Sequence, residues 1–162
     1  CVRMFRIKHG FVTGAPSEGP FFPMQRTLFT LSRRSFSSAR TSVSFGAAPW
    51  GELTHSSRAV RVGDTIHVSG TVAQGETCAD QVKGCFDIIS QAIKDAGGRG
   101  LQDVVITRMI AADAVGDLDE LARAHHEVFS AVDTRPAQTT FGGTLVRDWI
   151  KVEIEATAVV GS

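Results

Sequence analysis

Glu153 is the residue whose setting in this sequence best suits acid–base chemistry. From Ile150 to Val160 apolar residues occupy every second position, which predicts a β-strand with one core-facing side. Glu153 falls on the other side of that strand, where a carboxylate near a subunit boundary can take up and release protons. The position is more typical of a solvated strand residue, and the pattern leaves both interpretations open.

Three histidines offer further reactive groups, but their spacing favours structural roles. His67 lies in a predicted strand over residues 65–72, on a half-polar face where a lone histidine is usually only hydrogen-bonded. His125 and His126 are adjacent in a predicted helix, so their side chains diverge by about 100°. Neither has a carboxylate or a cysteine four residues further on. We therefore expect no metal site.

The three cysteines have no regular spacing, and an odd number of them forms neither a disulfide framework nor a zinc site. Cys78 and Cys85 lie seven residues apart in a predicted helix, two turns along one side, and are expected to be small semi-buried residues. This usage favours a reducing intracellular compartment.

The candidate groups lie on a regular succession of predicted elements. Alternating apolar residues predict strands, and apolar residues at spacings of three and four predict helices. Thr77 with Asp80 is a capping pattern, and Asp117 with Glu120 begins the second helix in the same way. The ranges are strands over 58–62 and 65–72, a helix over 77–96, a strand over 104–112, a helix from 117 to about 132, and strands after the rigid Arg135–Pro136 turn.

The order β-β-α-β-α-β-β predicts an α+β fold with one mixed sheet and both helices on one face. The strand over 104–112 is the most continuously apolar and is expected at the centre of the sheet. Gly70 interrupts its strand and predicts a bulge or a close approach of backbone or ligand. The uncovered face is half apolar, which predicts a symmetric homo-oligomer with binding pockets between subunits. Its polar residues would be His67, Ser69, Thr71, Lys151, Glu153 and Thr157.

Composition and charge indicate which classes of binding partner to expect. The chain has 162 residues, 43% of them hydrophobic, with a mean hydropathy of +0.03, which suits one globular domain. No apolar run approaches the roughly 20 residues of a membrane helix. Residues 45–162 hold ten basic and sixteen acidic residues, so this part carries about −6 and repels phosphate backbones. Nucleic acid and membrane are therefore not the expected partners.

Residues 1–44 differ from the rest, with seven Lys or Arg and one acid, Glu18. Residues 24–44 are rich in Arg and Ser and hold no acid, a composition typical of a mitochondrial transit peptide. The alternative is a disordered basic tail on a cytoplasmic protein. Residues 1–23 show no periodicity and are expected to be a disordered extension or sequence upstream of the true start. The folded domain is thus placed at 45–162 and the extension at 1–44.

Short motifs in the folded part resemble the RidA/YjgF family, also called the liver perchloric-acid-soluble protein family. The resemblance spans roughly residues 50–160 with the motifs in the family's order. It implies a chorismate-mutase-like fold and a homotrimer with three clefts between subunits. The motifs are SRAVRVGD at 57–64, VSG at 68–70, RPA at 135–137 and VEIEATA at 152–158.

The resemblance also implies an activity: hydrolysis of reactive 2-enamine/2-imino acids, such as 2-iminobutanoate and 2-iminopropanoate, to 2-keto acids and ammonia, without a cofactor. By position, Glu153 corresponds to the family glutamate that positions water. Gly70 corresponds to the glycine whose carbonyl helps to hold that water.

Three positions depart from the family pattern. Gln138 stands where the family has the arginine that grips the substrate carboxylate, Ser56 stands where it has a tyrosine, and Thr140 stands where some members have a cysteine. Losing a charge-assisted bidentate contact costs on the order of a few kcal/mol in transition-state binding. Arg135 or Arg58 would be the cations available to replace it.

Three functions follow as hypotheses. The first is an imine deaminase that is weakened or redirected to another substrate. The second is a non-catalytic trimer that binds a small metabolite or regulates another protein, which the missing arginine and tyrosine favour. The third is an endoribonuclease, an activity linked to some relatives, against which the acidic domain argues.

Overall fold

The computed structural model of the protein describes residues 39–112 and 118–161, in which six strands form one sheet. The sheet order is β1-β2-β3-β6-β4-β5, with the β4–β5 pair parallel and the other neighbours antiparallel. The elements are β1 (Arg40–Val43), α1 (Trp50–Thr54), β2 (Ala59–Val62), β3 (Thr65–Thr71), α2 (Cys78–Asp95), a 3-10 turn (Leu101–Asp103), β4 (Val104–Ala112), α3 (Leu118–Ser130), β5 (Ala137–Gly143) and β6 (Val152–Val159).

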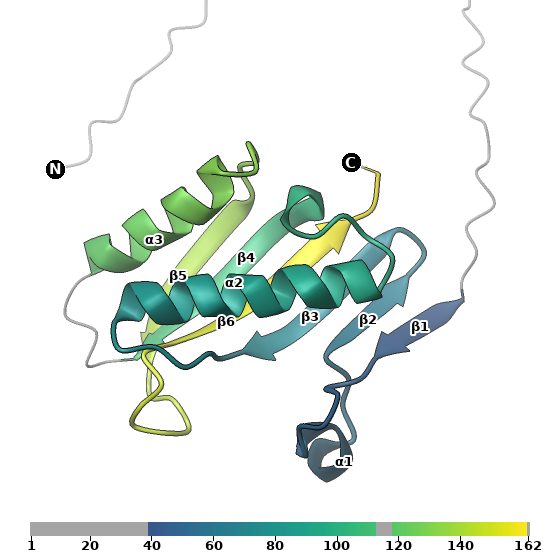
Figure 1. Ribbon diagram of the computed structural model, residues 1–162, viewed down its shortest axis with the longest axis horizontal. Helices are drawn as coiled ribbons and strands as arrows, with labels where there is room; N and C mark the ends of the chain where they lie inside the picture. Colours follow the sequence, from purple (N-terminus) through teal and green to yellow (C-terminus); the bar gives the residue numbers. More distant parts are fainter. Residues whose placement is uncertain (1–38, 113–117, 162) are drawn as a thin grey trace, which may run out of the picture. The chain divides into compact units, whose positions relative to one another are not determined.

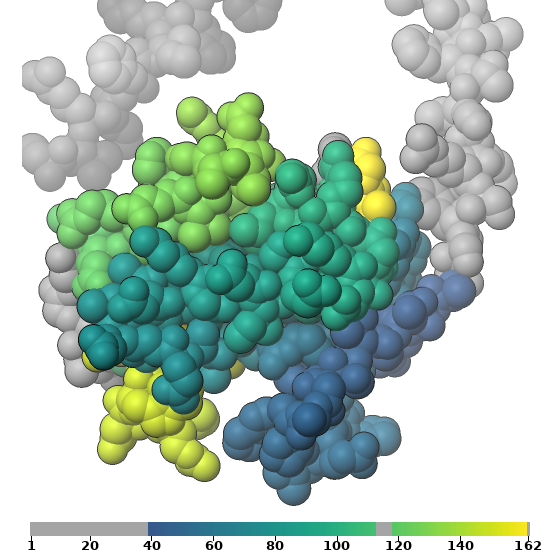
Figure 2. Space-filling model, in the orientation of Figure 1, coloured from purple at the N-terminus to yellow at the C-terminus, as the bar shows by residue number. Residues whose placement is uncertain are grey.

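Helices α2 and α3 lie together on one face of the sheet, as predicted (Figure 1). In the space-filling view they cover most of that face, while α1 and the loop between β5 and β6 project beyond it (Figure 2). Strand β4 lies between β6 and β5, which confirms its predicted interior position. The α+β fold class is therefore confirmed. Within the described residues, no helix is both long and apolar enough to span a bilayer.

The core forms where the apolar stripe of α2 meets the helix-facing residues of the sheet. Val82, Phe86, Ile89 and Ile93 recur every three or four positions, and all are buried. The sheet supplies alternate residues of β3, β4 and β6, because successive strand residues point to opposite faces. The sheet side of the core is Ala59, Ile66, Val68, Val104, Met109, Ala111, Val152, Ile154, Ala156 and Ala158.

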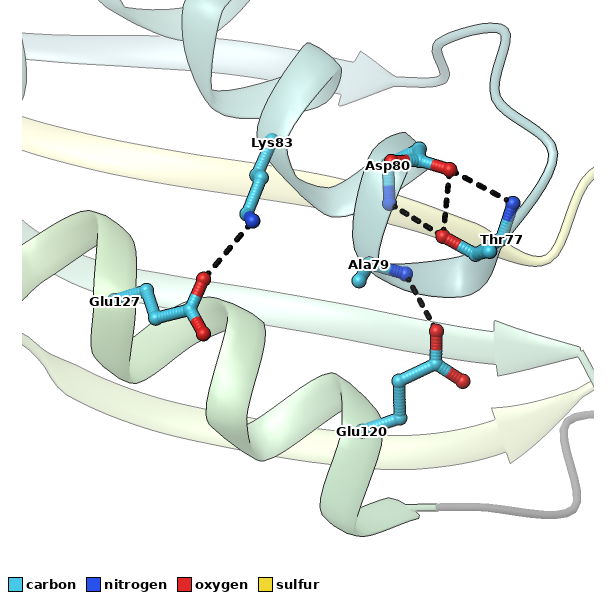
Figure 3. Close-up of polar contacts among 6 residues, drawn as sticks. All are labelled: Thr77, Ala79, Asp80, Lys83, Glu120 and Glu127. Atoms are coloured by element: carbon cyan, nitrogen blue, oxygen red, sulfur yellow. Dashed lines mark hydrogen bonds and ion pairs between the residues drawn. The ribbon is translucent and has the colours of Figure 1, made fainter.

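The starts of the two helices are joined by polar contacts (Figure 3). Thr77 and Asp80 form the predicted capping box, in which each side chain accepts the backbone N–H of the other. Glu120 in the first turn of α3 accepts the backbone N–H of Ala79 at 3.0 Å, so α3 also caps α2. Lys83 and Glu127 form a 2.9 Å ion pair between the helices, and its exposure makes its contribution small. Asp117, the predicted cap of α3, lies outside the described residues.

The buried side of α3 consists of Leu121, Ala124 and Phe129. Leu118, the first residue of the helix, is 61% exposed.

Strand β1 lies within the stretch predicted to be an extension. Residues 40–43 pair with β2 in a four-residue antiparallel register, so the folded domain begins before residue 45. Without β1, strand β2 would be the edge of the sheet, with unpaired backbone groups. The polar and β-branched residues of β1 suit an edge strand that pairs with β2. The helix α1 was also not predicted, because five residues are too few to show a helical period. Residues 1–38, with most of the predicted transit peptide, lie outside the described part.

A bulge in β3 changes which face Thr71 occupies. The β3–β6 register shifts between Val68 and Thr71, as Gly70 predicted. The extra residue turns Thr71 into the core, where it is fully buried, although uninterrupted alternation had placed it on the open face. Because of the bulge, Gly70 lies beside β6 without a Cα partner in the register of the two strands.

Gln81 fixes the segment that leads into β6. Its side chain is buried and donates to the carbonyl oxygens of Trp149 (2.9 Å) and Gly75 (3.3 Å), while its own amide oxygen accepts the backbone N–H of Lys151 (2.8 Å). One helix residue therefore sets where β6 begins, and with it the position of Glu153.

Candidate functional site

Glu153 and Gly70 lie in direct contact across strands β6 and β3. A Cβ atom added to Gly70 would be 2.0 Å from the Oε1 of Glu153 and 3.0 Å from its carboxyl carbon. No side chain larger than hydrogen fits between this backbone and the carboxylate in its present position. The two residues predicted to act together are therefore brought together by the sheet.

The surroundings of Glu153 disfavour its charged form. Partial burial raises the pKa of the Glu153 carboxyl above its ordinary value, and the neighbouring charge of Glu155 raises it further. Glu155 itself lies 3.7 Å from the guanidinium of Arg108 on β4. A carboxyl group whose pKa is moved toward neutrality is better suited to taking and returning a proton than an ordinary surface glutamate.

Arg58 holds the other side of the Gly70 peptide. Its Nη1 donates to the Gly70 carbonyl oxygen (3.3 Å) and to the Thr71 Oγ1 (2.9 Å), and its guanidinium lies 4.3 Å from the centre of the Phe45 ring. Arg58 is thus the cation placed at the Gly70 carbonyl.

Cys85 lies beneath this group and is not a nucleophile. Its thiol contacts the Thr71 carbonyl oxygen at 3.2 Å in the core, and burial raises the pKa of the Cys85 thiol to about 12. Cys78 is also buried, and both are free thiols, as expected from their spacing.

Ser56 lies at the same end of the sheet as Arg58. It follows α1, its hydroxyl is 2.5 Å from that of Thr54, and it is exposed. Gly51 of α1 packs against both Ser56 and Phe45, the ring beneath Arg58. Phe45 was not singled out from the sequence, since a single aromatic residue in a Gly- and Ala-containing loop carries no pattern.

Gln138 and Thr140 line a separate cavity of about 450 Å³ between α3 and β5. The amide Nε2 of Gln138 donates to the Sδ of Met109 at 3.5 Å and to the hydroxyl of Thr140. The remaining lining residues are Leu118, Asp119, Leu121, Ala122, His125, Phe141 and Gly142.

Arg135 contributes neither to the site around Glu153 and Gly70 nor to the cavity lined by Gln138 and Thr140. It is exposed beside a second hollow of about 420 Å³ at the end of α3, formed with His126, Ser130 and Asp133 among others. Strand β5 runs parallel to β4 with Ala137 opposite Ile106, whereas Glu153 is opposite Ile110. Arg135 therefore precedes the start of β5. It lies more than four residues before Phe141, the β5 residue that pairs with Ile110 in the same row as Glu153.

The register places Gln138 and Glu153 on opposite faces of the sheet. Glu153 shares a row with Ile110 and Phe141, which belongs to the open face. Gln138 shares a row with Thr107, whose neighbour in β6 is Ala156, and both of those residues are buried under the helices. A single chain thus joins Glu153, Gly70 and Arg58, and it does not join them to Gln138 and Thr140.

The histidines have the structural settings that their spacing suggested. His67 is exposed on the open face opposite Thr157. The His125 Nε2 lies 3.1 Å from the Thr107 hydroxyl, and its ring packs on Phe86 and Phe129. Burial, and then the charge of His126, lowers the pKa of His125 and keeps it neutral. Across residues 39–112 and 118–161, His, Cys, Asp and Glu form no group of three that could hold a metal ion.

Comparison with known proteins finds the same fold and similar sequences. Residues 47–160 match the family model of endoribonuclease L-PSP. The uncharacterized protein SCO2049 of Streptomyces coelicolor is 34% identical over 120 residues, which cover 67% of this chain and 86% of that protein.

Two solved structures show the extent of the likeness. The crystal structure of Rv2704 from Mycobacterium tuberculosis, a member of the YjgF/YER057c/UK114 family, is 34% identical, with a TM-score of 0.69 over 75% of this chain and all (100%) of that one. The YjgF gene product of Escherichia coli is 21% identical, with a TM-score of 0.61 over 73% of this chain and 93% of that one. The second likeness concerns the fold alone.

Proposed function

Because the chain belongs to the endoribonuclease L-PSP family, which includes the YjgF/YER057c/UK114 proteins, we propose that it is a hydrolase of reactive imines. In this reaction water adds to the C=N carbon, the C–N bond breaks, ammonia leaves and a carbonyl compound remains. The observation that carries the proposal is the Glu153 carboxylate held against Gly70 in partly buried surroundings that raise its pKa.

Glu153, Gly70 and Arg58 are called the Glu153 group below, and each has a role in this proposal. Glu153 accepts a proton from the attacking water and returns it to the leaving nitrogen, which a pKa displaced toward neutrality favours in both directions. The Gly70 carbonyl oxygen accepts the second hydrogen of that water. Arg58 bonds the same oxygen and keeps the peptide in place, so we regard it as a positioning residue.

The proposed site is completed by a second copy of the chain. Gln138 and Thr140 lie on the helix side at the edge strand β5, so they reach a Glu153 group only if it belongs to a neighbouring subunit. Contacts of this kind, between two different surfaces, close into a ring when the rotation allows. We propose a homotrimer with three such clefts, built on the open face of the sheet.

The test is imine hydrolysis in the presence of an enzyme that generates the imine. The protein is added to a dehydratase reaction, and release of ammonia is compared with buffer and with the Glu153→Gln variant. We expect acceleration by the protein and a loss of about 10²-fold or more in the variant, which lacks the proton acceptor. A trimer that does not accelerate release would contradict the proposal and favour the non-catalytic binding trimer.

We also propose that residues before β1 direct the protein to the mitochondrial matrix. The Arg- and Ser-rich composition of 24–44 supports this, and the strand at Arg40–Val43 requires that cleavage leave that strand intact. Import of the full chain into isolated mitochondria, followed by N-terminal sequencing, tests both points. Failure of the chain to enter, or cleavage after Val43, would contradict them.

A further inference from the structure

We propose that the cavity between α3 and β5 selects imines derived from amines, without a carboxylate, over imino acids. This inference rests on the proposed function and assigns the substrate class. It has three supports: the residues that line the cavity, the uncharged amide of Gln138, and the lack of an arginine or lysine side chain among the described lining residues.

The cavity wall offers no positive charge among the described residues. Its lining is apolar at Leu118, Leu121 and Ala122, and its one charged side chain is that of Asp119. A carboxylate placed there gives up water without gaining a charged partner, and the like charge of Asp119 disfavours it further. An alkyl chain placed there instead gains from leaving water.

Gln138 offers the cavity an uncharged amide. A thioether sulfur accepts hydrogen bonds but cannot donate, so the group facing Met109 Sδ is the amide nitrogen. The same nitrogen donates to Thr140. The donor of this amide is thus engaged within the chain, and the side chain carries no charge to pair with a substrate carboxylate.

His125 adds no charge either. Its Nε2 is engaged with Thr107, and its packing against Phe86 and Phe129 keeps the ring half-buried and neutral. Arg135, three residues before Gln138, lines the other hollow rather than this cavity. Arg58 would enter the assembled cleft from the neighbouring subunit, but its guanidinium is already bonded to the Gly70 carbonyl oxygen and the Thr71 hydroxyl. The described lining therefore holds no arginine in place of the one that an imino acid would require.

Two imines with the same ethyl group provide the test. Propan-1-imine, made by an amine oxidase from propylamine, differs from 2-iminobutanoate, made by an amino-acid oxidase from 2-aminobutanoate, only by the carboxylate. We expect kcat/KM for propan-1-imine to be higher by about tenfold or more, because an unpaired carboxylate costs at least that much in transition-state binding. Gln138→Arg is expected to reverse the preference, and Gln91→Arg, on the exposed side of α2, to leave it unchanged.

A binding experiment separates this inference from the hydrolase proposal. Propionamide and 2-oxobutanoate are not turned over, and their binding is followed by thermal shift and calorimetry. Tighter binding of propionamide supports the inference even if neither imine is hydrolysed, in which case only the hydrolase proposal fails. Tighter binding of 2-oxobutanoate, binding of neither compound, or faster hydrolysis of 2-iminobutanoate by the unmodified protein would overturn the inference.

Discussion

At the residue scale, the contact between Gly70 and Glu153 makes a sharp prediction for Gly70→Ala. The added methyl would occupy the position of the Glu153 Oε1, which is the far end of a flexible side chain and can swing away. We expect the variant to fold, with circular dichroism unchanged, and to lose about 10²-fold in imine hydrolysis, because a displaced general base is out of reach of its proton.

The control for this substitution is the double variant Gly70→Ala/Glu153→Gln. If the methyl acts only by displacing the carboxylate, adding it to Glu153→Gln should cost nothing further, since residues that act as a unit are not additive. A full additional loss would show that Gly70 acts through its own backbone instead.

The raised pKa of Glu153 predicts a stability that depends on pH. A carboxyl whose pKa is higher in the folded than in the unfolded protein contributes stability below its ordinary value of 4.5, and that contribution is lost as pH rises through the folded value. Glu153→Gln should therefore match the unmodified protein in Tm near pH 4 and exceed it modestly at about pH 8. A variant with the lower Tm at the higher pH would indicate that Glu153 is stabilised as an anion.

At the element scale, Gln81 is expected to stabilise the start of β6. Gln81→Leu conserves volume but leaves three backbone groups unpartnered, those of Gly75, Trp149 and Lys151. We expect a loss of about 2–4 kcal/mol in the free energy of unfolding, measured by denaturant titration. The matched control is Gln91→Leu, on the exposed side of the same helix, which should change stability by less than about 0.5 kcal/mol.

The sequence predicted elements better than it predicted contacts between them. The strand over 104–112 and the helix over 77–96 were found within two residues of their predicted ends, because the strand is a continuous apolar run and the helix has a long apolar stripe. The helix α1 and the strand β1 were missed, because each is too short for a period to appear. The role of Gln81 was invisible for a different reason: its partners lie up to 70 positions away in the chain.

The candidate site was likewise predicted only in part. The family resemblance implied that Glu153 and Gly70 act together, and they are in contact across β3 and β6. The bulge at Gly70 was predicted from the glycine itself, which is a local feature of the sequence. The separation of Gln138 from Glu153 was not predicted. It depends on the registers of β5 and β6 against β4, which sequence alternation within each strand does not determine.

At the scale of the whole molecule, the open face of the sheet is expected to hold the subunits together. Ile106 and Ile110 are half-buried on this face in a single chain, beside exposed Phe141. Ile106→Lys would place a charge in an apolar contact and should shift the proposed trimer to monomers in analytical ultracentrifugation, with loss of the proposed hydrolysis. Ile88→Lys, the same change on the exposed side of α2, should leave the assembly intact; dissociation by Ile88→Lys instead would move the interface to the helices.

The division of the site between two faces gives the most direct test of the assembly. Glu153→Gln removes the proton acceptor from one half of the cleft, and Gln138→Trp fills the other half. Each variant alone should be inactive as a homotrimer. Dissociated and reassembled at equal amounts, the two should recover about a quarter of the unmodified activity, since each cleft in a ring draws one half from each of two neighbouring subunits at random. If both halves came from one chain, every cleft would carry a defect, and the mixture would stay inactive however the subunits were combined.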